Sequence, residues 1–82
     1  MNESELFKIL SRLHAMQVDV TSPIQQRRFE KFGVEVCRVT YDHQTKLFSV
    51  ASYRPDFEAQ FDDIDLVAIE VYENLAHLAY VF

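Results

Sequence analysis

The spacing of apolar residues changes twice along this chain, and this limits the folds that it can adopt. Near the start, apolar residues recur every three to four positions, as on one face of a helix; they are Leu6, Ile9, Leu10, Leu13 and Met16. In the middle, apolar and polar residues alternate, as in a strand with one buried face. The helical spacing then returns in the last third. The chain is therefore predicted to form a sheet that is preceded and followed by a helix.

Capping and turn residues set the expected limits of the first elements. A helix is predicted over Glu3–Val18, after a capping box of Asn2 and Glu5 and before Pro23. Strands are predicted over four segments, which are Gln26–Lys31, Val34–Tyr41, Leu47–Tyr53 and, as a short fourth strand, Phe57–Phe61.

The last segment is the most apolar of the predicted elements. Asp62, with Asp65 three residues later, is expected to cap a helix and to place negative charge at its positive end. The apolar stripe of this helix is Ile64, Val67, Ala68, Val71, Leu75 and Leu78, widened by Leu66, Ile69 and Tyr72. A helix that is apolar over so much of its circumference usually contacts more than one surface.

Together these elements predict the α+β class. We expect a two-layer α/β sandwich, in which an antiparallel meander of three to four strands carries the N-terminal and the C-terminal helix on one face. A chain of 82 residues and 9.7 kDa is long enough for one modest core, so a single domain is expected over residues 1–82.

The two hairpin turns decide which side chains share a face of the sheet. For the first, a two-residue turn would give Phe32 a positive φ and would place Phe29 opposite Cys37. We therefore expect a three-residue loop over residues 31–33 with Gly33 left-handed. For the second, a four-residue loop over residues 42–45 is expected, which pairs Val39 with Phe48.

These turns define an inner and an outer face of the predicted sheet. The inner face is Phe29, Cys37, Val39, Tyr41, Phe48 and Val50, packed against Leu6, Leu10, Leu13, Val67, Val71 and Leu75. The outer face is Arg28, Glu30, Val36, Arg38, Thr40, Ser49 and Tyr53.

Composition excludes several classes of function. One glycine is too few for a P-loop or a dinucleotide-binding fingerprint, and one cysteine excludes an internal disulfide framework. The net charge of −5 argues against a whole-domain attraction to nucleic acid. That charge is polarised, because residues 55–82 hold seven acidic side chains and no Lys or Arg. The start lacks a basic signal region and the uncharged stretch Asn74–Phe82 is too short to span a bilayer, so a cytoplasmic location without membrane contact is expected.

The residues that could carry chemistry have simpler structural interpretations. The acidic group at residues 62–65 is interpreted as a helix start, since its spacing does not match a calcium loop. His14, His43 and His77 lack the spacing of a helical zinc site and are expected on the solvent side. Cys37 is expected to pack in the core as a small hydrophobe. No catalytic residue, metal ligand or cofactor is predicted.

Two stretches of the sequence resemble a known family. One is Phe29-Glu30-x-x-Gly33-x-x-Val36-Cys37-x-Val39-x-Tyr41, and the other is the acidic cap and apolar helix of residues 61–73. With Ser11-Arg12-Leu13 in the opening helix, they resemble the YkuJ-like proteins of Gram-positive bacteria. The resemblance implies a small two-layer α/β domain. It implies no activity, because the family is a domain of unknown function, and the tail Ala76–Phe82 departs from its shorter members.

Three functional hypotheses from different classes follow. The leading one is a non-catalytic protein that forms a homodimer and acts by binding another protein, with an interface drawn from Leu66, Ile69, Tyr72, Tyr80, Val81 and Phe82. The second is a nucleic-acid-binding accessory that uses the arginines of the outer sheet face, and it would show a steep salt dependence. The third is a small ligand-binding protein or enzyme with a pocket between the helices and the sheet.

Overall fold

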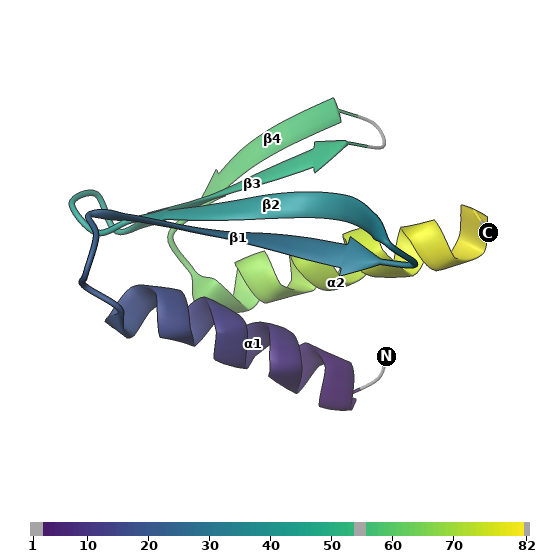
Figure 1. The fold of residues 1–82 in the computed structure, drawn as a ribbon, viewed down its shortest axis with the longest axis horizontal. Helices are drawn as coiled ribbons and strands as arrows, with labels where there is room; N and C mark the ends of the chain where they lie inside the picture. The colour runs from purple at the N-terminus through teal and green to yellow at the C-terminus, as the bar shows by residue number, and fades with distance from the viewer. Residues whose placement is uncertain (1–2, 54–55, 82) are drawn as a thin grey trace.

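Two helices cover one face of a single antiparallel sheet (Figure 1). The computed structural model describes residues 3–53 and 56–81, with side chains described for residues 4–53 and 56–77. Its elements are α1 (Glu3–Val18), β1 (Ile24–Lys31), β2 (Val34–Asp42), β3 (Leu47–Tyr53), β4 (Asp56–Phe61) and α2 (Ile64–Val81). Within these residues the strands form a meander of four in the order β1-β2-β3-β4, which confirms the predicted α+β architecture and its fourth strand.

The core lies between the sheet and the two helices. All six side chains expected on the inner face are buried there, together with Leu13, Val67 and Val71 from the helices. Leu6, Leu10 and Leu75 are half-buried and pack against the edge of this core. The remaining members of the core cluster are Ile9, Met16 and Ala68. The apolar periodicity therefore located the core correctly.

The first hairpin differs from its prediction. Its turn has two residues, with Lys31 paired to Val34, and both turn residues are left-handed, Phe32 at φ 56° and Gly33 at φ 74°. The expected three-residue loop is thus wrong, because the chain tolerates an aromatic residue in a conformation that usually favours Gly or Asn.

A β-bulge reverses the effect of this turn on the inner face. Glu30 pairs with Glu35, but Phe29 pairs with Cys37, so Val36 is an extra residue of β2 without a partner on β1. This insertion returns Phe29 to the face of Cys37, which is the outcome that had favoured the longer loop. It also puts Glu35 on the outer face with Arg38, while Val36, expected on the outer face in regular pairing, is buried at the bulge.

The second hairpin is shifted by an even number of residues from its prediction. Val39 pairs with Val50 and Tyr41 with Phe48, so the turn spans residues 43–46. The turn is closed at Asp42, whose carbonyl accepts from the Lys46 amide at 2.7 Å and whose Oδ1 accepts from the Gln44 amide at 2.8 Å. Since side chains alternate with a period of two, the two-residue error in pairing left every residue on its expected face.

The cap of α2 lies one residue later than expected. Asp63, not Asp62, precedes the helix; its Oδ1 accepts from the Asp65 amide at 2.8 Å and its carbonyl accepts from the Val67 amide at 3.2 Å. At its other end α2 runs past the sheet (Figure 1). The predicted capping residue Asn2 and the tail residue Phe82 lie outside the described residues. In the part of the chain described, neither helix is long and apolar enough to cross a membrane.

Candidate interaction surfaces

Cys37 is fully buried in the core, as predicted. Burial raises the pKa of its thiol to about 12, and the carboxylates of Glu70 and Glu35 add to that shift. A thiol with so high a pKa is protonated at neutral pH and is a poor nucleophile. Its place in the structure is that of a small apolar residue.

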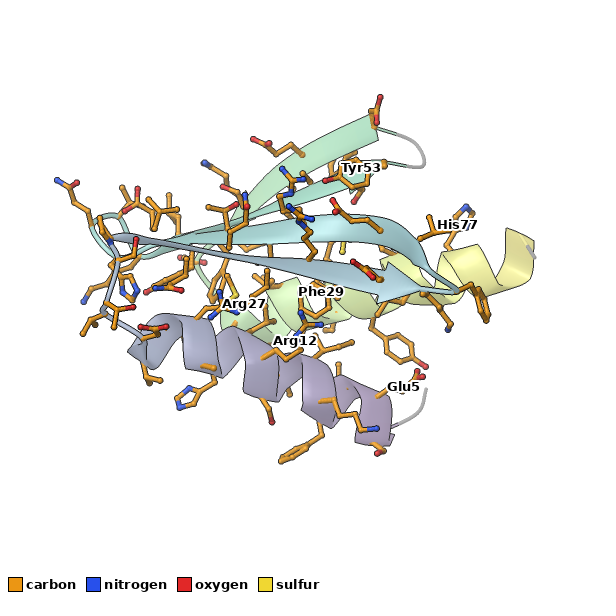
Figure 2. The ribbon with its side chains drawn as sticks, viewed as in Figure 1. Glu5, Arg12, Arg27, Phe29, Tyr53 and His77 are labelled. Atoms are coloured by element: carbon orange, nitrogen blue, oxygen red, sulfur yellow. The ribbon has the colours of Figure 1, made fainter. Side chains whose placement is uncertain are left out.

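The histidines and acidic residues do not gather into one site. His14 is exposed on α1, and His77 lies on α2 (Figure 2). His43 is half-buried in the β2–β3 turn with its ring edge-on to Tyr41, 4.9 Å between centroids, so its expected placement on the solvent side is only partly correct. Within residues 3–53 and 56–81, no group of three His, Cys, Asp or Glu side chains is placed to hold a metal ion.

The outer face of the sheet carries a polar network centred on Glu35. The Tyr53 hydroxyl donates to Glu35 Oε2 at 2.5 Å, and Arg38 Nη2 donates to the same oxygen at 3.4 Å. Arg28 Nε lies 3.6 Å from Glu35 Oε1. The hydrogen bond from Tyr53 is the main cause that lowers the pKa of Glu35, and the same bond raises the pKa of Tyr53. Tyr53 stands on the sheet face away from the helices (Figure 2).

The four arginines that suggested a nucleic-acid surface do not share one face. Arg28 and Arg38 are on the outer face and both lie against Glu35. Arg27 alternates to the inner side of β1, where it donates to the Gln26 carbonyl at 2.7 Å. Arg54 lies outside the described residues. The structure therefore brings together only two of these arginines, and it pairs both with a carboxylate.

Arg12 connects α1 to the edge of the sheet. Its Nη2 donates to the carbonyl of Arg28 on β1 at 2.8 Å, and its guanidinium lies 4.0 Å from the centre of the Phe29 ring. Figure 2 shows Arg12 and Phe29 facing each other between α1 and β1. A planar cation over an aromatic face is a favourable contact, so this residue helps to position the first helix.

The helix layer exposes large apolar side chains. On α2, Leu66 is 49% and Ile69 is 39% exposed, and on α1 Phe7 and Val18 are exposed as well. Tyr72, expected beside Leu66 and Ile69, is instead half-buried and packs against the core. The side chains of Tyr80 and Val81, and all of Phe82, lie outside what the structure describes, so that half of the predicted interface stays a prediction.

A hollow of about 300 Å³ lies between the β3–β4 end of the sheet and α2. It is lined by Ser52, Asp56, Phe57, Glu70, Glu73, Asn74 and His77. The sequence gave no indication of this hollow, because its residues come from three elements that are separated by up to 25 positions. Glu35 was missed for a different reason, since regular pairing would have placed it on the inner face.

Comparison with known proteins finds one family and one protein that resemble this chain. The model of a family described as protein of unknown function (DUF1797) matches residues 9–75. The uncharacterized protein YkuJ of Bacillus subtilis (strain 168) is 31% identical over 77 residues, which are 88% of this chain and 98% of that protein. The X-ray structure of YkuJ from Bacillus subtilis is similar with a TM-score of 0.81 at 30% identity, again over 88% of this chain and 98% of that one.

Proposed function

The chain belongs to the DUF1797 family, whose description gives no activity, and from its own surfaces we propose that it is a non-catalytic cytoplasmic protein that self-associates and acts by binding another protein. One observation carries this proposal, namely the exposed apolar side chains of the helix layer, Phe7 and Val18 on α1 and Leu66 and Ile69 on α2. Monomeric proteins seldom expose contiguous apolar surface, and where they do it usually marks an interaction site.

A second copy of this chain is the occupant that fits the helix layer. The layer has apolar groups on both helices, so a twofold axis can place α1 of one copy against α2 of the other with a single self-complementary patch. Charge supports this crossed arrangement. The described part of α2 carries Asp65, Glu70 and Glu73 and no Lys or Arg, whereas α1 carries Lys8 and Arg12. Like helices would set acidic residues against acidic residues, and crossed helices avoid that repulsion.

The spacing on α2 extends the apolar surface toward its end. Leu66, Ile69, Glu73, Ala76 and Tyr80 are separated by three or four positions in turn, which is the spacing of a helix seam. The helix continues past the sheet, where the sheet offers it no cover (Figure 1). A partner helix supplied by a second copy would cover this end, including the tail residues that the sequence had suggested for the interface.

Ile69→Lys tests the proposal, with Ile24→Lys as the matched control. Both isoleucines are exposed, 39% and 47%, but Ile24 lies on β1 and not on the helix layer. We expect light scattering to give twice 9.7 kDa for the wild type and for Ile24→Lys, and a mass that falls with dilution for Ile69→Lys. A wild-type mass that stays at 9.7 kDa up to high micromolar concentration would overturn the dimer. Deletion of Tyr80–Phe82 then separates a contact through the tail from one through the body of the helices.

The nucleic-acid hypothesis has less support. Glu35 lies against both Arg28 and Arg38, and these are the arginines that the structure describes on the outer face. A phosphate group would have to compete with that carboxylate. Catalysis likewise has little support, because the buried thiol with its raised pKa is protonated at neutral pH.

A further inference from the structure

The hollow between the sheet and α2 has the charge of a cation site. Three carboxylates line it, Asp56 from β4 and Glu70 and Glu73 from consecutive turns of α2, and no Lys or Arg is among its lining residues. Carboxylates that converge on one concave surface create a negative potential that concentrates cations there. Charge alone would fit many acidic surfaces, so the neutral groups of the hollow decide what it can bind.

Ser52 supplies an independent indication of a ligand. It is only 7% exposed, it lies on the inner face of β3, and its hydroxyl makes no hydrogen bond to any other residue that the structure describes. A buried hydroxyl without a partner is unfavourable by the cost of removing it from water. Because Ser52 lines the hollow, an N–H donor bound there can satisfy this hydroxyl without any rearrangement of the fold.

The remaining walls favour an organic cation over a metal ion. Asn74 Nδ2 donates to the Glu70 carbonyl at 2.8 Å, which leaves the Asn74 amide oxygen as an acceptor on the wall. Phe57 is exposed at the rim, and an aromatic face attracts an ammonium group. In the part of the chain described, no three acidic or histidine side chains converge closely enough for a metal. A volume of about 300 Å³ is at the lower limit of small-molecule sites.

We propose that this hollow binds an alkylammonium group, with the ammonium between the carboxylates and Ser52 and the methylene chain against Phe57. The group can be supplied by a free polyamine or by a lysine side chain of a protein, since both present the same primary ammonium on an aliphatic chain. The site does not depend on the proposed self-association, because that contact was argued from Phe7, Val18, Leu66 and Ile69.

Two probes tell the sources apart. Spermidine and the peptide acetyl-Gly-Lys-Gly-amide are titrated into ¹⁵N-labelled protein, and the shifts of the Ser52 and Phe57 amides and of the Asn74 side-chain amide are followed. We expect saturable shifts confined to the hollow, weaker at high salt because the attraction is screened. Tighter binding of spermidine assigns the site to a free polyamine, and tighter binding of the peptide assigns it to a protein lysine.

Variants separate a site from general acidity. Glu73→Gln should weaken binding by roughly two- to fivefold, the range of one exposed ion pair. Glu58→Gln is the matched control, because Glu58 lies on the outer side of β4 and makes the same change in net charge without lining the hollow. Ser52→Ala should also weaken binding while leaving the protein equally stable, since its hydroxyl has no partner to lose. Equal effects of Glu58→Gln and Glu73→Gln, or no saturable shift with either probe, would overturn the proposal.

Discussion

Phe32→Asn should make this protein more stable, although it removes an aromatic side chain. Phe32 is left-handed at φ 56° and is followed by Gly33, also left-handed, so the turn has the backbone for which Asn-Gly is the preferred pair. Holding a residue with an ordinary side chain in this conformation costs about 1–2 kcal/mol, and Asn tolerates it with less strain. Phe32 is 65% exposed and Lys31 Nζ lies 5.8 Å from its ring, a contact that contributes about 0.5–1 kcal/mol at an exposed position.

The balance of these terms is a gain of about 0.5–1 kcal/mol, measured by urea unfolding with far-UV circular dichroism because the chain has no tryptophan. Phe7→Asn is the matched control. Phe7 is 69% exposed but helical, and Asn is a poorer helix former, so this variant should be slightly less stable. Gly33→Ala should cost about 1–2 kcal/mol from the backbone alone, because an added Cβ meets no atom within 4 Å. A destabilised Phe32→Asn together with an unaffected Gly33→Ala would refute the two-residue left-handed turn.

Three further predictions concern the core, the helix cap and the outer face. Val39→Ala should cost about 1–4 kcal/mol in unfolding free energy and Leu75→Ala less, because Val39 is fully buried and Leu75 is half-buried. Asp63→Ala should cost about 0.5–2 kcal/mol and Asp62→Ala much less, and equal losses in thermal unfolding would contradict the assignment of the cap. Tyr53→Phe should raise the pKa of Glu35 toward its ordinary value of 4.5, as seen by NMR titration, because it removes the main cause of the lowered pKa. Since a lowered pKa stabilises the folded state above about pH 4.5 and that contribution is lost as the pH falls through the folded pKa, the acid side of the stability profile should flatten in Tyr53→Phe; an unchanged Glu35 titration would show that the hydrogen bond is not its cause.

The sequence predicted the layers of this fold better than its connections. Apolar periodicity depends on burial, which acts over whole elements, and so Phe29, Val39 and Phe48 were placed on the correct face. The turns depend on the backbone of single residues. Phe32 accepts a conformation that residue statistics disfavour, and Val36 forms a bulge that compensates for it. Neither event could be predicted alone, because each makes the other acceptable.

The candidate sites were predicted less well than the fold, for the same reason. Glu35 reaches the outer face only through the bulge, so the network with Arg28, Arg38 and Tyr53 was hidden in regular strand pairing. The hollow at Ser52 joins β3, β4 and α2, and a contact between distant segments leaves no local pattern in the sequence. Leu66 and Ile69 could be predicted, because surplus apolar residues on a helix are visible in the sequence itself.

The contact of Arg12 with β1 has a consequence for behaviour in concentrated solution. β1 is an edge strand, and an edge strand presents backbone groups to which a strand of another molecule can add, which leads to aggregation. Arg12 occupies the Arg28 carbonyl on this strand and covers Phe29 beside it, so the side chain acts as a guard on the edge. At the opposite edge, β4 is short and begins with Asp56 and Glu58, whose charges repel a second strand. Solubility in this small protein therefore depends on a helix residue at one edge of the sheet and on carboxylates at the other.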